Sequence, residues 1–192
     1  MEALQEAVRA RQAAMADRTA LLNRKGAAVS SVLRDALKRM IEATDDLVAV
    51  LDKEIARIVA ADDVLARRKT VLSSIPGIGP VAAVALIVDL SEMGDCSGKA
   101  ASALAGLAPF ACDSGGSVGR RSIRGGRSAL RMVLYMSAVA AARSNADLRR
   151  FYERLRLKGK AAKVALTAVM RKLVVIANTL IKEDRLWRPI RP

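Results

Sequence analysis

Apolar residues recur in alternating steps of four and three between residues 33 and 58. The series runs through Leu33, Leu37, Met40, Thr44, Leu47 and Leu51, and it shifts at Ile55 and Ile58. This spacing is a heptad with an interruption, and it indicates a long α-helix because strand residues alternate with a period of two. A shorter apolar series from Leu4 to Leu22 precedes Gly26, where we expect a first helix to end in a left-handed glycine.

These two helices predict a coiled-coil helical hairpin over residues 1–70, used for self-association or as a spacer. The edge of an ordinary helical bundle fits the same pattern. Apolar residues make up 52% of the 192-residue chain and aromatic residues only 3%, which favours helices packed through small aliphatic side chains over a β-sandwich. We therefore predict an all-α fold.

The chain contains no histidine. Its absence excludes Ser-His-Asp and Cys-His nucleophile pairs, histidine general bases and histidine-ligated zinc. The apolar runs are too short or too interrupted by charge for a membrane span, so we expect no membrane partner. Two cysteines and no signal-peptide pattern indicate a reducing cytoplasm.

Positive charge is concentrated in the second part of the chain. The net charge is +14 overall, and residues 75–192 carry 20 basic and 8 acidic residues, a net +12. Within residues 115–175 there are 15 basic residues against only Asp147 and Glu153. Such a surface attracts polyanions, and we favour nucleic acid over an acidic membrane or a solvated face.

Residues 63–74 and 81–90 are helical in pattern and flank a short Pro-Gly-rich segment at residues 75–80. Gly77 and Gly79 allow a sharp turn, and Pro80 suits the first position of a helix. The segment resembles the helix-hairpin-helix of DNA-binding proteins, in which backbone amides at a helix N-terminus bind phosphate. A simple connector between helices has the same pattern.

A segment rich in glycine and arginine follows residue 106. Five of the 12 glycines fall between residues 115 and 126. The candidate phosphate-binding arginines here are Arg120, Arg121, Arg124, Arg127 and Arg131. Ser114, Ser117 and Ser122 lie in the same segment, where a serine hydroxyl is either a nucleophile on a phosphodiester or a turn former.

The later helices add a second basic face. Lys160, Lys163 and Arg171 recur with Thr167 on one side of a predicted helix whose other side is apolar. This side is a candidate contact for the nucleic-acid backbone, and a solvated helix flank is the alternative.

Several motifs together resemble the insertion-sequence one-ten class of bacterial transposases. They are Gly106-Leu107-Ala108-Pro109, Asp113-Ser114-Gly115, Gly125-Gly126-Arg127, Arg143-Ser144-Asn145, Lys158-Gly159-Lys160 and Arg185-Leu186-Trp187. The resemblance covers nearly the whole chain. It implies a C-terminal transposase domain at residues 71–187, with the helix-hairpin-helix and the basic serine loop, followed by a tail at residues 188–192.

The resemblance also implies a mechanism. Ser114, the serine before the first glycine of the loop, would attack a DNA phosphodiester and form a 5′-phosphoserine link; Ser117 and Ser122 are alternatives. In the family an RuvC-like domain with four metal-binding acids precedes the coiled coil. This chain begins on the coiled coil, so we expect no metal or cofactor bound by this chain alone and Mg²⁺ only in the complete enzyme.

The expected partners are double-stranded DNA at the element ends and target, a structured guide RNA, and further copies of the chain. A chain without the acidic domain is expected to be inactive alone. The alternative function is a non-enzymatic DNA- or RNA-binding remnant that keeps binding but not strand transfer. A membrane-surface or RNA-only binder is a third possibility.

Overall fold

The computed structural model describes residues 1–110, 122–123 and 128–189. Across these ranges the chain forms eight α-helices and one ladder of two short strands, which confirms the predicted all-α fold. The chain divides into two compact units, Met1–Ala66 and Arg67–Pro192. The sequence-based boundary after residue 70 lies inside α3 (Asp63–Ser73).

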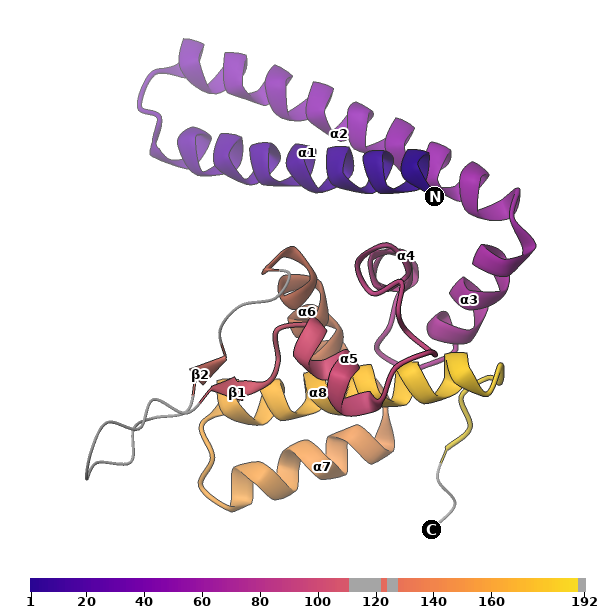
Figure 1. The fold of residues 1–192 in the computed structure, drawn as a ribbon. Helices are drawn as coiled ribbons and strands as arrows, with labels where there is room; N and C mark the ends of the chain where they lie inside the picture. Colours follow the sequence, from indigo (N-terminus) through magenta and orange to yellow (C-terminus); the bar gives the residue numbers. More distant parts are fainter. Residues whose placement is uncertain (111–121, 124–127, 190–192) are drawn as a thin grey trace. The chain divides into compact units, whose positions relative to one another are not determined.

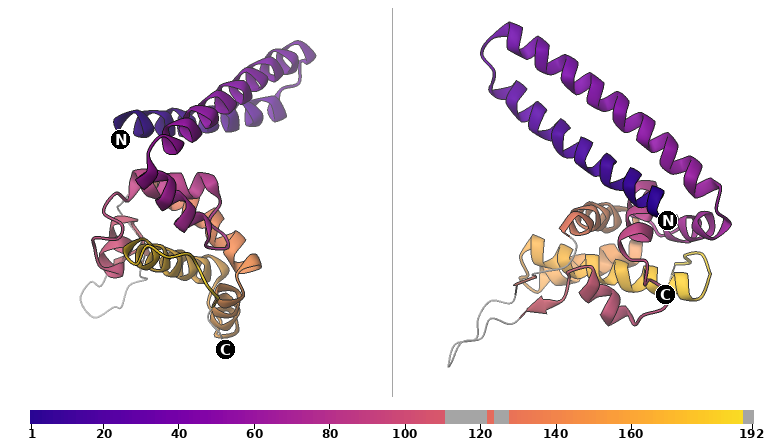
Figure 2. Two further views of the ribbon diagram at one scale, coloured as in Figure 1. Left: turned by 90° about the vertical axis from the view of Figure 1, so that its right-hand side faces the viewer. Right: turned by 45° about the horizontal axis from the view of Figure 1, so that its top comes forward.

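The first unit is a helical hairpin of α1 (Glu2–Ala27) and α2 (Ser31–Ala60), which run side by side (Figure 2). Two ion pairs between the helices fix their antiparallel register. Arg11 Nε lies 2.6 Å from Asp52 Oδ1, and Arg18 Nε lies 2.5 Å from Asp45 Oδ1. The sums of the paired residue numbers are equal, so both pairs belong to one register.

The apolar side chains that the hairpin buries differ in part from the predicted stripes. Buried residues are Leu4, Ala7, Val8, Ala14 and Leu21 on α1, and Leu37, Ile41, Ile55 and Val59 on α2. The predicted stripes also included Met15 and Leu22 on α1 and Leu33, Met40 and Leu47 on α2, and these five are exposed. On α1 the seven-residue spacing of Val8, Met15 and Leu22 is met one position earlier by Ala7, Ala14 and Leu21, which are buried.

The connection between α1 and α2 differs from the prediction at Gly26. This glycine lies inside α1 and has no left-handed φ; the helix ends at Ala27 and Ala28 is extended. Ser30 caps α2, and Arg34 donates from Nε to the carbonyl of Ala28 and from Nη2 to that of Val29, both at 2.9 Å. These contacts satisfy backbone carbonyls, and the turn therefore does not need a left-handed glycine.

The second unit is built around α8 (Ala162–Lys182), which contacts α5 (Gly98–Leu104), α6 (Ser128–Ser144) and α7 (Ala146–Leu157) (Figure 1). α4 (Pro80–Asp89) packs against α6, and its residues 82–88 are all buried. Buried side chains recur on the apolar side of α8 at Ala165, Val169, Leu173 and Leu180, whereas Ile176 is half-buried. Asn145 caps α7, accepting from the amides of Asp147 and Leu148.

A buried amide fixes the segment between α4 and α5. Asn178 of α8 accepts from the Gly94 amide at 2.9 Å and donates from Nδ2 to the Cys96 carbonyl at 2.9 Å. Its side chain is 4% exposed, so these bonds satisfy polar atoms that have little access to water. Asn178 therefore ties this loop to the central helix.

Gly77 lies in the turn between α3 and α4 and has a left-handed φ of +107°. A Cβ at this position would lie 2.4 Å from Ala141 Cβ and 2.7 Å from the Ala141 backbone on α6. Glycine is required here both for its φ and for the close approach of α6.

Substitution of Gly77 by alanine is expected to lower the free energy of unfolding by about 2–4 kcal/mol, because both strain and overlap oppose the new methyl group. Gly159→Ala is the matched control, since Gly159 has φ +76° with no atom within 4 Å of a new Cβ. That control is expected to cost only about 1 kcal/mol. Urea unfolding measures both values, and equal costs would contradict a packing role for Gly77.

Candidate nucleic-acid interface

A short β-ladder holds the two ends of the glycine-rich segment together. β1 (Pro109–Phe110) pairs antiparallel with β2 (Ser122–Ile123), with Phe110 opposite Ser122. The chain therefore leaves and re-enters the fold at one place. Ser122, one of the alternative nucleophiles, lies on β2 itself.

Most of the predicted loop residues lie outside the described residues. These are Ser114, Ser117, Arg120, Arg121, Arg124 and Arg127. Arg131 lies in the first turn of α6 and is half-buried. α6 therefore begins directly after the segment.

Arg171 connects α8 to the segment that leads into β1. Its Nε donates to the carbonyl of Leu107 at 2.5 Å, and Leu107 is fully buried. Burial lowers the pKa of the Arg171 guanidinium from its ordinary value, although an arginine keeps its charge at neutral pH. Leu107 lies two residues before β1, so Arg171 holds the backbone that leads into this strand. This packing role is in addition to the predicted place of Arg171 on a phosphate-binding face.

The turn between α3 and α4 places its two glycines differently. Gly79 is exposed, precedes Pro80 at the first position of α4 and has open space around it. The first amides of a helix lack partners within the helix, so this end of α4 presents N–H groups. Gly77, by contrast, lies against Ala141, as described above.

α7 ends in a glycine cap, and this cap positions Lys160 before α8 begins. Gly159 has φ +76°, its amide donates to the Arg156 carbonyl at 2.9 Å, and the Lys160 amide donates to the Leu155 carbonyl at 3.1 Å. This is a Schellman motif. Lys160 therefore precedes α8 instead of lying on it, while Lys163 occupies the first turn of α8; both are exposed.

α7 and the residues at its two ends were not predicted from the sequence as a binding surface, although the structure exposes a dense set of cations there. Residues 143–163 contain eight basic residues and two acidic ones. We call the basic residues the α7 basic surface: Arg143, Arg149, Arg150, Arg154, Arg156, Lys158, Lys160 and Lys163, all exposed. The signal in the sequence was the polar side of a helix whose apolar side is Leu148, Phe151 and Leu155.

Local contacts orient several of these cations. Arg150 Nη2 lies 2.8 Å from Asp147 Oδ1, and Arg156 Nη1 donates to the Lys160 carbonyl at 2.7 Å. The Phe151 ring has Arg154 Cζ 5.5 Å and Lys172 Nζ 4.7 Å from its centroid. Because the ring attracts both cations, it holds a side chain of α7 and one of α8 near each other.

Within the described part of the chain, no three His, Cys, Asp or Glu side chains come together as a group able to hold a metal ion. α8 is long and apolar enough to cross a membrane by length and composition, but half of its apolar window is buried in the protein. A core helix has the same properties.

Comparisons with known proteins identify a family model and several relatives that match parts of this chain. Residues 69–153 match the model of the transposase IS116/IS110/IS902 family. A pilin gene-inverting protein of Moraxella bovis is 33% identical over 144 residues, which is 73% of this chain and 45% of that protein. The IS116 44.8 kDa protein of Streptomyces clavuligerus is 34% identical over 161 residues, 81% of this chain and 39% of that protein. The IS110 43.6 kDa protein of Streptomyces coelicolor is 30% identical over 125 residues, 64% of this chain and 31% of that protein.

The chain belongs to the IS116/IS110/IS902 transposase family.

The family match runs from α3 to α7. It includes the turn with Gly77 and Gly79, the strands β1 and β2, the segment between them, and most of α7. The chain spans less than half the length of these curated relatives. The matched region therefore includes the first part of the candidate interface, and it is followed by Arg154, Arg156, Lys158, Lys160, Lys163 and Arg171.

Replacing Arg171 by lysine is expected to lower the free energy of unfolding by about 1–2 kcal/mol, because the Leu107 carbonyl loses its donor while the positive charge is kept. Lys163→Arg, on the same side of α8 but exposed, is the control and should change stability little. Chemical denaturation compares the two variants. If Arg171→Lys unfolds at the wild-type denaturant concentration, the hydrogen bond to Leu107 does not support the fold.

Proposed function

We propose that this chain takes part in DNA transposition or site-specific DNA recombination as the DNA-binding C-terminal part of an insertion-sequence transposase. The observation that carries the proposal is the family match over residues 69–153, which includes the turn at Gly77 and Gly79, the strands β1 and β2 and most of α7. The relatives include a protein named for pilin gene inversion and proteins of two insertion elements.

The charge of the second unit supports DNA as the partner. The α7 basic surface lies close in sequence to the loop arginines Arg120, Arg121, Arg124 and Arg127. Cations of this density attract the phosphodiester backbone without reading bases. The exposed N-terminus of α4 at Gly79 and Pro80 would add backbone N–H groups, in the manner of a helix-hairpin-helix.

The proposed chemistry is attack by Ser114. Its Oγ would lose a proton and bond to a DNA phosphorus; the P–O bond to the neighbouring 3′ oxygen would break, and that oxygen would take up a proton. The product is a 5′-phosphoserine link and a free 3′ hydroxyl. The Asp113-Ser114-Gly115 motif supports this assignment, and pairing of β1 with β2 supports a loop anchored at both ends.

The remaining partners are part of the same proposal. Mg²⁺ would be held by an acidic domain outside these 192 residues. The chain would act with a structured guide RNA, as a homo-oligomer, in the bacterial cytoplasm. The residues described here would bind and orient the DNA backbone and position the loop.

Binding to double-stranded DNA is expected to fall steeply with salt. If about six basic groups meet phosphates, log K should drop by about five for each tenfold rise in salt. Changing Lys160 and Lys163 to glutamine should flatten this slope by about two, because each lost phosphate contact removes about 0.9 from it.

Fluorescence anisotropy over a salt series measures the slope. The matched control changes Lys38 and Lys53 of α2, two exposed lysines outside the interface, to glutamine. A wild-type affinity that does not respond to salt would exclude backbone binding. Equal losses in both double variants would show that the effect is one of net charge alone.

Ser114→Ala is expected to keep the affinity for DNA, since an uncharged serine neutralises no phosphate, and to abolish any covalent product. The chain is incubated with labelled DNA, Mg²⁺, guide RNA and the separately expressed acidic domain of a family member, then denatured and separated by electrophoresis. Ser117→Ala serves as the control for the neighbouring hydroxyl.

A denaturation-resistant band that depends on Ser114 supports the proposed chemistry. A band that persists in Ser114→Ala moves the nucleophile to another residue. Salt-sensitive binding with no band, even after addition of the acidic domain, would identify a binding remnant that cannot transfer strands.

A further inference from the structure

A second apolar stripe on α2 lies beside the side of the helix that the hairpin buries. Its members recur in steps of three and four: Leu33, Ala36, Met40, Ala43, Leu47 and Val50. Leu33 and Leu47 are 50% exposed, Met40 53% and Val50 61%. A heptad stripe on a soluble helix is ordinarily covered by another helix.

The side chains that α2 buries form a different series. Leu37, Ile41, Ile55 and Val59 are buried, so α1 uses the neighbouring side of the helix. The exposed stripe spans 17 residue steps, or roughly 25 Å of helix. α2 therefore has two apolar sides and only one of them has a partner inside the hairpin.

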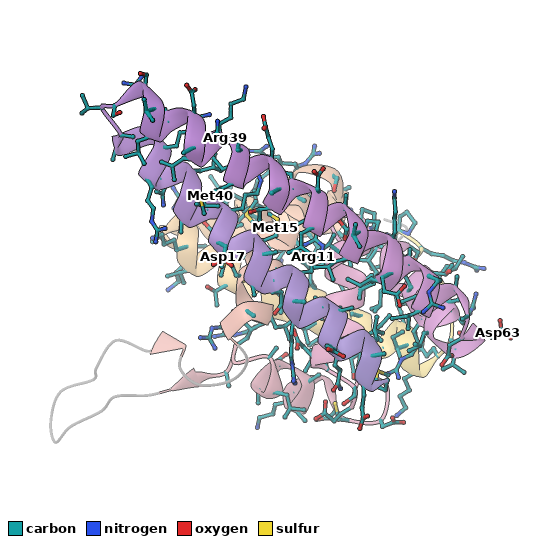
Figure 3. All side chains as sticks on the ribbon, turned by 90° about the horizontal axis from the view of Figure 1, so that it is seen from above. Arg11, Met15, Asp17, Arg39, Met40 and Asp63 are labelled. Carbon is teal, nitrogen blue, oxygen red and sulfur yellow. The ribbon has the colours of Figure 1, made fainter. Side chains whose placement is uncertain are left out.

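The charges beside the stripe determine which partner fits. In heptad positions with Leu33, Met40 and Leu47 at a, Arg39 and Asp46 both lie at g. Both are exposed, and neither forms an ion pair with any of the described residues. Figure 3 shows Arg39 and Met40 adjacent on α2. One g position is basic and the next is acidic, so the stripe is complementary to itself in reverse orientation.

We infer that this stripe docks against the same stripe of a second copy of the chain, with the two α2 helices antiparallel. In that orientation Leu33 packs against Val50 of the other copy, Ala36 against Leu47 and Met40 against Ala43, so all six members are covered. In antiparallel pairs g positions face one another, and Arg39 of each copy meets Asp46 of the other. A parallel alignment would instead place Arg39 opposite Thr44.

This inference gives a surface to the homo-oligomer proposed above, but it requires no DNA, RNA or chemistry. Its test uses the full chain without nucleic acid. Sedimentation equilibrium is carried out over concentrations that bracket the micromolar Kd expected for so short an interface.

Reversing one g charge, as Arg39→Glu or as Asp46→Arg, turns two attractive contacts of the symmetric dimer into repulsive ones. Each single reversal is expected to weaken association by about tenfold. The double variant Arg39→Glu with Asp46→Arg restores both attractions with exchanged signs and should return the Kd to within about threefold of wild type.

The matched controls are Lys38→Glu and Asp35→Arg, at exposed positions of α2 away from g. Lys38 loses only a 3.8 Å pair with Glu42. Circular dichroism checks that helix content is kept in every variant. Met40→Lys, at an exposed apolar position, should give a monomer with wild-type helix content.

Rescue by the double reversal, with unaffected controls, supports the antiparallel dimer. A chain that stays monomeric throughout, a dimer indifferent to Arg39 and Asp46, or equal effects of the control reversals would each overturn it. DNA affinity of Arg39→Glu is measured in parallel. A variant that loses the dimer but still binds DNA, or that keeps the dimer but no longer binds DNA, shows that the two properties are independent. Failure of this inference can then be told apart from failure of the proposed function.

Discussion

The second unit depends on the burial of α8. This helix supplies apolar side chains to its contacts with α5, α6 and α7, and it also carries two polar side chains that hold loops. Asn178 fixes the segment between α4 and α5, and Arg171 fixes the carbonyl of Leu107 ahead of β1. Elements that are distant in sequence are therefore placed relative to one helix, and each polar contact is satisfied where water has little access.

This arrangement separates the parts that support the fold from the parts that can meet DNA. Gly77 and the Nε of Arg171 are used in packing, whereas Lys160, Lys163 and the cations of α7 are exposed. The Schellman motif at Gly159 ends α7 without using a charged side chain as the cap, which leaves the lysines around it exposed. A basic surface of this kind is held in place by backbone geometry and by the Phe151 ring.

The sequence was sufficient for features that depend on local patterns. Apolar spacing predicted the two helices of the hairpin and an apolar side for the helix that carries Lys163 and Arg171. In the structure Ala165, Val169 and Leu173 are buried on that helix. The sequence was insufficient where partners lie far apart in the chain. Nothing near Gly77 indicates that Ala141 will approach it, and nothing near Arg171 indicates the Leu107 carbonyl. The heptad of α2 was recognised, but a stripe alone does not say which of two adjacent sides α1 will cover.

The contacts that follow α8 reach back to the start of the same unit. Arg67 of α3 binds Asp184 through its carboxylate and its carbonyl, both at 2.7 Å, and the Trp187 amide donates to Ser74 Oγ at 2.8 Å. During synthesis, α3 leaves the ribosome more than a hundred residues before these partners do. Its final attachment must therefore wait until residues 184–187 have emerged, so the unit cannot complete its fold before α8 has been translated.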